Sequence, residues 1–364
     1  MENLEQQFSE GLILTTSRHE TQSSNSVREH SPDPIPVDLL IEIFSRVPLK
    51  SIARFHCLSK FLASILRRHD FTELFLTKSL TRPRLLFTVK TKGKLLFYSS
   101  PQPHNPDDNS SLVATSYHPT LVPDHQPTYI CKPVCGLVLL QGCGRRKRPL
   151  ICNPAKGKVR TLPKVPRKGI NTPKGIYLGY DPIGKQFKVL CLSLNNSLYI
   201  SPNTHWILAL ESGKQGTLEG SFVIVWFDVR SEKFGFINKD EDMSPKPNDY
   251  DTSPSTLFNY KDKLGIHCLV EENLVLWVLE DAGNHKWSKH SYVLSPLGYH
   301  IVSRSLFVGM TSTGEIVYSW NSSVWFYNIE KNTIKRVNIQ GLEELEPPTF
   351  INNFLDYVEN MKFL

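Results

Sequence analysis

The chain has 364 residues, of which 40% are hydrophobic and 21% are charged, the ordinary balance of a globular protein with two or three domains. Its formal charge of +7 is spread thinly along the chain, so it permits an acidic partner but makes nucleic acid an unlikely one. No run reaches the roughly 18 apolar residues that a membrane span requires, so we expect no membrane association.

Seven cysteines are present, an odd number for a long chain. No N-terminal segment combines a basic start, an apolar core and a small-residue cleavage site. We therefore expect reduced thiols and a cytoplasmic or nuclear location, and not a disulfide framework.

Residues 1–33 are polar and hold few large apolar groups, so they predict a disordered tail. The next segment is much more apolar and predicts three short helices. Pro36 suits the first turn of a helix and Pro48 ends one. Asp70 and Glu73 resemble a capping pair for a last turn. The apolar positions that recur at helical spacing are Leu39, Leu40, Ile43, Phe44 and Val47, then Leu49, Ile52 and Phe55, then Leu58, Phe61, Leu62, Ile65 and Leu66.

Beyond Arg82-Pro83 the chain consists of short runs rich in Val, Ile, Phe, Tyr and Trp, separated by Gly, Pro, Asn and Asp, which predicts an all-β region. Residues 99–127 and 239–254 are expected to be long loops.

A repeated pattern lies within this region. Each copy has an Asn or Asp, a turn, and then an apolar strand start, which is typical of a hairpin whose turn is begun by that side chain. Most copies are roughly 50 residues apart, the size of one propeller blade, although the first spacing is shorter and unrelated hairpins of similar composition are an alternative. The copies begin at Asn153, Asp181, Asp228, Asp281 and Asn328.

No catalytic motif was found, so an enzyme built on a propeller scaffold is the weakest hypothesis, and no cofactor is expected. A zinc site is disfavoured because only the first pair among Cys131, Cys135, Cys143 and Cys152 has ligand spacing. The basic run from Arg145 to Arg148 is more typical of a solvated hairpin tip than of a binding site or a nuclear signal.

Three helices of this size cannot cover their own apolar surface. Either the β region covers them or a partner does, and the pattern alone leaves both possibilities open. The stretch IPVDLLIEIFSRVPLKSIARFHCLSKFLASILRRHDFTELFL resembles an F-box of the form common in plants, with Leu62 where that family usually has Trp.

The resemblance implies that the helices dock on a Skp-type adaptor and, through it, on a cullin. The adaptor contacts that it implies are Pro36, Leu39, Ile43, Leu49, Ile52, Cys57, Leu58, Lys60 and Leu62.

The remainder resembles the F-box-associated β domain, through segments such as KPVCGLVLL, YLGYDPIGKQFKVLCL and FDVRSEKFGFI. One departure is that the family has a further apolar strand segment where this chain has ESGKQGTLEG, so a blade is expected to be incomplete. The fold class expected is thus α+β, with a three-helix F-box before a propeller-like all-β domain. The domains expected are a tail (1–33), the F-box (34–80), the β domain (81–340) and a C-terminal tail with one short helix (341–364).

The function implied is that of a non-catalytic substrate-recognition subunit of a Skp–cullin–F-box ubiquitin ligase, with the β domain binding an unidentified target protein. The alternative is an F-box protein outside the ligase, or a decayed one, that binds adaptor without delivering a substrate. Leu62 and the missing segment motivate that alternative.

Overall fold

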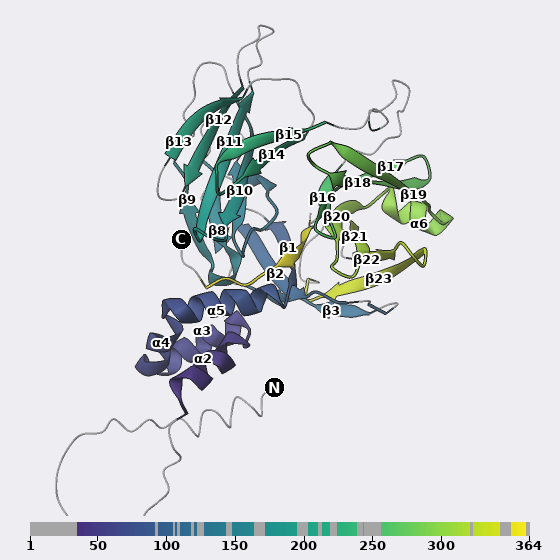
Figure 1. Cartoon of the computed structure of the whole chain (residues 1–364). Coiled ribbons are helices and arrows are strands. Elements are labelled where there is room, and N and C mark those ends of the chain that lie inside the picture. The colour runs from purple at the N-terminus through teal and green to yellow at the C-terminus, as the bar shows by residue number, and fades with distance from the viewer. Residues whose placement is uncertain are drawn as a thin grey trace, which may run out of the picture.

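The computed structural model describes residues 35–91, 94–104, 106–107, 110–117, 120–121, 127–142, 148–163, 172–194, 203–209, 213–218, 224–238, 243, 256–320, 323–342 and 351–361. A helical domain precedes a β domain, and Figure 1 shows the helices as a bundle beneath the strands. The expected disordered tail, the basic run up to Lys147, and nearly all of the expected loop at 239–254 lie outside the described residues.

The helical domain contains α2 (Val37–Ser45), α3 (Leu49–Leu58), α4 (Lys60–Leu66) and α5 (His69–Leu80). Pro36 and Pro48 are the N-cap residues of α2 and α3, so the prolines mark the two boundaries as expected. The expected last turn is instead a fourth helix of 12 residues. Its N-cap is Arg68 and not Asp70; the Asp70 carboxylate lies in the first turn, where it bonds the Arg68 guanidinium and favours the helix dipole.

The core of this domain is formed by apolar side chains that recur at helical spacing, so that each helix buries one stripe. Met361 joins this core from the far end of the chain. No helix among the described residues has both the length and the apolar character needed to cross a membrane. The buried members of the core are Leu40, Ile41, Phe44, Leu49, Ile52, Leu62, Ile65, Leu66, Phe71 and Phe75, together with Met361.

The β domain consists of six sheets in the described part of the chain, and neighbouring strands are antiparallel in all but one pair. The first sheet joins β24 (Ile351–Tyr357), β1 (Arg84–Thr91), β2 (Lys94–Pro101), β4 (Thr115–Ser116) and β5 (Thr120–Leu121). The second joins β6 (Pro127–Ile130), β7 (Val138–Gly142), β8 (Leu150–Asn153) and β9 (Lys158–Thr161), and the third joins β10 (Thr172–Asp181), β11 (Gln186–Leu194), β12 (Asn203–Ala209) and β13 (Gly213–Leu218).

The fourth sheet has β14 (Ile224–Asp228) and β15 (Lys233–Ile237), and the fifth has β16 (Thr256–Tyr260), β17 (Lys263–Val270), β18 (Asn273–Asp281) and β19 (Lys286–Val293). After the short helix α6 (Pro296–Val302), the sixth sheet joins β20 (Leu306–Met310), β21 (Glu315–Trp320), β22 (Ser323–Asn328) and β23 (Thr333–Gln340) to β3 (Ser111–Val113). The short strands β3, β4 and β5 lie inside the segment expected to be a loop at 99–127.

Most consecutive sheets share an apolar core and the sixth packs against the first, which makes the domain propeller-like. The third and fourth sheets are joined by an ion pair between Lys188 Nζ and Glu232 at 2.7 Å. In β1, Leu85 and Phe87 pack against the sixth sheet, whereas Leu86 packs against the second. In β18, Leu274 faces the sixth sheet and Val275 faces the fourth. Because successive side chains of a strand point to opposite faces, a strand between two sheets needs an unbroken apolar run, and this explains the runs in the sequence.

The ring is closed by strand β24, which pairs with β1 from the opposite end of the chain. Residues 351–357 were expected to belong to a C-terminal tail with a short helix, and that expectation is wrong. Leu355 and Tyr357 are buried in the cores on either side of the sheet. Residues 351–357 can complete the sheet only because β1 offers an unpaired edge, which the local sequence of the tail does not reveal.

The fourth sheet has two strands among the described residues, and the segments on either side of it, 219–223 and most of 239–255, lie outside them, so the expected incomplete blade stays a prediction. The hydrophilic segment that suggested a missing strand is itself in part a strand, β13, which pairs with β12. A strand at the edge of a sheet is held by backbone hydrogen bonds, so it does not require an apolar pattern.

All five copies of the repeated pattern form hairpin turns, as expected. In each, the Asn or Asp oxygen accepts hydrogen bonds from backbone N–H groups two or three residues ahead, at 2.8–3.3 Å. The short first spacing arises because Asn153 begins the last hairpin of its sheet and Asp181 begins the first hairpin of the next. The fourth residue after each Asn or Asp has a left-handed backbone: Gly157, Lys185, Glu232, His285 and Asn332.

Candidate functional site

An apolar stripe on α2 is exposed to solvent. Leu39 is 55% exposed and Ile43 is 42% exposed, and Ile35, which precedes the N-cap Pro36, is exposed as well. Leu39 and Ile43 are four residues apart, so they lie above one another on one side of the helix. We name Ile35, Leu39 and Ile43 the α2 stripe. The opposite side of α2 carries Leu40 and Phe44 into the core of the helical domain.

A second exposed apolar group lies where α3 meets α4, and we name Leu58 and Phe61 the α3–α4 corner. Ser59 between them has an extended backbone, and its side chain accepts a hydrogen bond from the Leu62 N–H at 3.1 Å, which starts α4. Because the chain turns at Ser59, Leu58 and Phe61 remain outside the core. Cys57 and Lys60 beside them are also exposed.

Three of the residues assigned to adaptor contact are instead part of the domain's own core. Leu49 is 4% exposed, and Ile52 and Leu62 are 1% exposed. Side chains with so little accessible surface do not face a partner, so the structure corrects their assignment as direct contacts. Their helical spacing does not distinguish an inward face from an outward one. Leu62 therefore fills the core, and its difference from the Trp typical of the family is a difference in packing.

The remaining assigned residues are exposed, namely Pro36, Leu39, Ile43, Cys57, Leu58 and Lys60. Ile35 and Phe61 are further exposed apolar residues that were not among the expected contacts.

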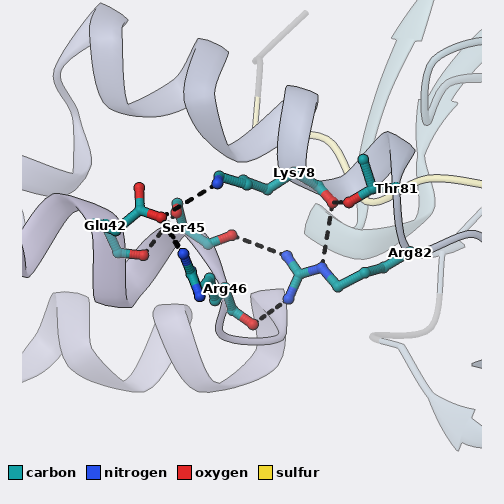
Figure 2. A network of polar contacts seen from close by, with 6 residues as sticks. All are labelled: Glu42, Ser45, Arg46, Lys78, Thr81 and Arg82. Carbon is teal, nitrogen blue, oxygen red and sulfur yellow. Dashed lines mark hydrogen bonds and ion pairs between the residues drawn. The ribbon is translucent and has the colours of Figure 1, made fainter.

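A polar network holds α2 in position against α5 (Figure 2). The Glu42 carboxylate binds Lys78 Nζ at 3.2 Å and Arg46 Nη2 at 2.5 Å. These two bonds hold the pKa of Glu42 below its usual value. The Arg82 guanidinium donates to the carbonyl oxygens of Ser45, at 2.9 Å, and of Arg46.

Those carbonyls end α2, which has no basic residue in its own last turn. A cation at a helix C-terminus satisfies free carbonyl groups and favours the helix dipole. Arg82, which follows α5, thus supplies the positive charge that the last turn of α2 lacks, and it fixes the direction in which the α2 stripe points. Arg82 was not among the residues expected from the sequence to form this site.

The surface of the β domain offers exposed apolar side chains on several sheets, among them Tyr129, Tyr177, Trp226, Leu257 and Leu306. They do not single out one binding site. Trp226 lies in the two-stranded sheet, opposite Gly235 on β15. A Cβ at Gly235 would lie 2.1 Å from the Trp226 ring, so this glycine leaves room for the indole.

The cysteines considered as metal ligands are separated by the fold. Cys131 and Cys152 are buried in different cores, and burial raises the pKa of the Cys131 thiol to about 11. Cys143 lies outside the described residues. Among the described residues no group of three or more His, Cys, Asp or Glu side chains could hold a metal ion.

An uncovered helical face, followed by a propeller-like domain, defines a class of two-part binding protein, and comparison with known proteins agrees with this. Residues 34–74 match the F-box domain family. Residues 84–222 and 214–360 match the F-box associated beta propeller domain. The two matched ranges overlap at residues 214–222.

Relatives in Arabidopsis thaliana match over nearly the whole chain. Putative F-box protein At1g53370 is 41% identical, with 100% of each chain covered. F-box protein DOR is 38% identical, with 93% of this chain and 96% of the relative covered, and F-box protein At1g53790 is 40% identical, with 91% and 82% covered. The alignment with the first runs over 403 positions, more than the 364 residues of this chain, so it places gaps in this chain.

The chain belongs to the F-box protein family whose members carry an F-box-associated β-propeller domain. Proteins with this pair of domains have a substrate-receptor role, and members of the family are generally non-catalytic. The helical domain is hereafter called the F-box.

Proposed function

We propose that this protein is the substrate-recognition subunit of a Skp–cullin–F-box ubiquitin ligase. The observation that supports this proposal is the uncovered α2 stripe. Leu39 and Ile43 remain exposed although the same chain supplies a large β domain that could have covered them. Full burial of one such side chain is worth about 1.5–3 kcal/mol, so a partner that covers the stripe gains substantial binding energy.

The partner that suits this face is a Skp-type adaptor with an apolar groove, which in turn binds a cullin. The α2 stripe and the α3–α4 corner supply the apolar contacts, and Lys60 and Cys57 lie at the margin of the corner. The network around Arg82 holds α2 in the direction needed for docking.

The β domain then binds a target protein and holds it near a ubiquitin-loaded enzyme. Its contribution is effective concentration, since no residue of this chain is required to form or break a bond. We place this activity in the cytoplasm or nucleus. Each of the cysteines that the structure describes is a free thiol, which suits a reducing compartment.

The alternative function is adaptor binding without delivery of a target. It is motivated by Leu62 and by the hydrophilic segment before the fourth sheet, the two places where the chain departs from the family pattern. An incomplete blade would remove part of the surface on which a propeller presents its loops. Both functions require the adaptor, so they differ only in what the β domain does.

Two measurements test the proposal. Purified full-length chain is first mixed with a Skp-type adaptor, and stable complex formation is expected; failure to bind any Skp-type adaptor overturns both functions. Proteins captured by the full chain in plant cells are then followed for turnover, with the wild-type chain and with a Leu39→Asp chain. Faster turnover of a captured protein with the wild-type chain alone supports the ligase function, and equal turnover supports the alternative.

A further inference from the structure

The last described residues of the chain run between the F-box and the β domain. After β24, residues 358–361 leave the sheet, and Val358, Glu359, Asn360 and Met361 are all buried. A chain terminus is more often exposed and loosely held. Here Glu359, Asn360 and Met361 each form hydrogen bonds or packing contacts with residues distant in the sequence.

Glu359 contacts both domains with one carboxylate. Its Oε2 accepts a hydrogen bond from the backbone N–H of Leu49 at 2.9 Å, and its Oε1 accepts one from the Tyr117 hydroxyl at 2.8 Å. Leu49 is the first residue of α3 in the F-box, whereas Tyr117 follows β4 in the β domain. One buried side chain therefore joins the two domains directly.

Both groups that Glu359 bonds, the N-terminus of α3 and the Tyr117 hydroxyl, favour a carboxylate partner. Pro48, the N-cap of α3, makes no side-chain capping bond, and α3 has no acidic residue in its first turn, so Glu359 supplies the negative charge that a helix N-terminus favours. On the other side, Arg84 donates to Ser99 and Ser99 donates to Tyr117, which leaves the tyrosine proton directed at Glu359. Burial, followed by the nearby charge of Glu359, raises the pKa of Tyr117, so the hydroxyl stays protonated.

The next two residues hold the segment from both sides. The Asn360 side chain donates to the Cys135 carbonyl at 2.6 Å, and its own carbonyl accepts from the Asn153 side chain at 2.9 Å. The Met361 side chain enters the F-box core, and its carbonyl accepts from Lys156. Glu359 and Met361 thus contact both domains, and Asn360 bonds the β domain.

We infer that residues 358–361 are a clamp that fixes the F-box in one orientation on the β domain, with Glu359 as its positioning residue. The inference rests on the proposed function, because a fixed orientation places a bound target at a defined distance from the adaptor. A second contact supports the same orientation: Lys185 in the β10–β11 turn binds Glu73 in α5 at 2.6 Å.

The clamp is tested in the full-length chain with Glu359→Ala, Glu359→Gln and a chain that ends at Val358. The shortened chain keeps β24 and therefore the closed ring of sheets. Glu330→Ala is the matched control, since Glu330 lies exposed in the β22–β23 turn. Circular dichroism and tryptophan fluorescence establish that each variant keeps its β domain.

The orientation is measured as the distance distribution between spin labels on Cys57 and on Lys331→Cys, with Cys135, Cys143 and Cys268 replaced by serine. We expect one narrow distribution in the parent chain and in the control, and broad distributions in all three clamp variants. Amide hydrogen exchange at the start of α3 is expected to rise at least about tenfold in the clamp variants alone. Narrow distributions and unchanged exchange in the clamp variants would overturn the inference.

A glycine pair provides a second test that leaves the clamp residues intact. Gly136 has φ +82°, and a Cβ there would lie 2.5 Å from Asn360 Cβ and 2.7 Å from the Val358 carbonyl. Gly314 has φ +89° but meets only the end of the flexible Lys261 side chain, at 3.4 Å. Both alanine variants strain the backbone, but only Gly136→Ala is expected to broaden the distance distribution; equal behaviour of the two would count against the clamp.

Adaptor binding separates the two proposals. The α2 stripe is exposed whereas residues 358–361 are buried, so clamp variants are expected to bind adaptor within about threefold of the wild-type affinity. Failure of the wild-type chain to bind adaptor would contradict the proposed function but would not contradict the clamp. A loss confined to the clamp variants would show that the segment supports the F-box fold and does not merely orient it, which overturns the clamp.

Discussion

Glu359 accepts a hydrogen bond from the backbone N–H of Leu49 although the two residues are 310 positions apart in the chain. Arg82 does the converse for α2, where its guanidinium binds the last carbonyl groups of that helix. In both cases a helix end lacks a suitable charge in its own sequence and receives one from another element. The F-box is therefore ordered partly by residues outside the three helices that the sequence predicted.

Leu39→Asp and Ile43→Asp are each expected to lower adaptor affinity by at least about 100-fold, because each places an unpaired charge in an apolar contact. Isothermal titration with purified adaptor measures the effect. Leu297→Asp is the control, since Leu297 is exposed on α6 in the β domain, away from the F-box. Wild-type affinity in both variants would contradict docking through the α2 stripe.

Leu62→Ala is expected to lower the stability of the F-box by about 2–5 kcal/mol, since it leaves a cavity in a closely packed core. Leu39→Ala is expected to lower adaptor affinity and to leave stability almost unchanged, since Leu39 is exposed. Urea denaturation and adaptor titration on both variants separate the two roles. A Leu62→Ala chain with normal stability and weakened binding would restore Leu62 as a direct contact.

Arg82→Gln is expected to lower stability by about 1–2 kcal/mol, because the carbonyl groups that end α2 lose a charged donor. Adaptor affinity should fall as well, because α2 is held against α5 less firmly, by the Glu42–Lys78 bond without Arg82. Arg160→Gln on the exposed strand β9 removes the same charge without such a contact and serves as the control. Equal stability of the two variants would mean that the network does not position α2.

His267 is expected to make the β domain less stable in mild acid. Its ring is buried against Phe307 and within 3.0 Å of the Tyr318 hydroxyl, and burial lowers its pKa to about 4. Its pKa in the unfolded chain is about 6.5, so between these values the unfolded chain binds the proton and the folded one does not. Stability is thus complete above about pH 6.5 and falls by up to about 3 kcal/mol as the pH drops toward 4.

Denaturation curves measured across that range check this prediction. His267→Gln should show a weaker dependence on pH than the wild-type chain, because it has no group that titrates at this position. His300→Gln, on an exposed residue of α6, should show the wild-type dependence. Parallel curves for wild type and His267→Gln would contradict the buried neutral imidazole.

His285→Gly is expected to stabilise the β domain by up to about 1 kcal/mol, because His285 has φ +53° in the β18–β19 turn and glycine adopts that backbone without strain. Glycine already occupies the equivalent position in the β8–β9 turn, at Gly157. Lys286→Gly, one residue further on in strand β19, should instead destabilise the domain. Thermal melts of the two variants should therefore shift in opposite directions.

The sequence alone determined the class of this protein and much of its local structure. The helical spacing in the F-box, the apolar runs of the central strands and the Asn or Asp turns of the hairpins all depend on residues close together in the chain. Local preferences of this kind act through neighbouring side chains and backbone groups, so they can be read before any folding is known.

Only the tertiary structure decided which face of each helix is free, that residues 351–357 complete the first sheet, and that the hydrophilic segment before the fourth sheet holds an edge strand. These outcomes depend on partners distant in the chain: the Met361 side chain in the F-box core, the free edge of β1, and the backbone of β12. Leu39 and Leu62 have the same side chain at similar helical spacing, yet one is exposed and the other is buried. The difference arises because burial is set by what packs against a residue, which periodicity along a single element does not specify.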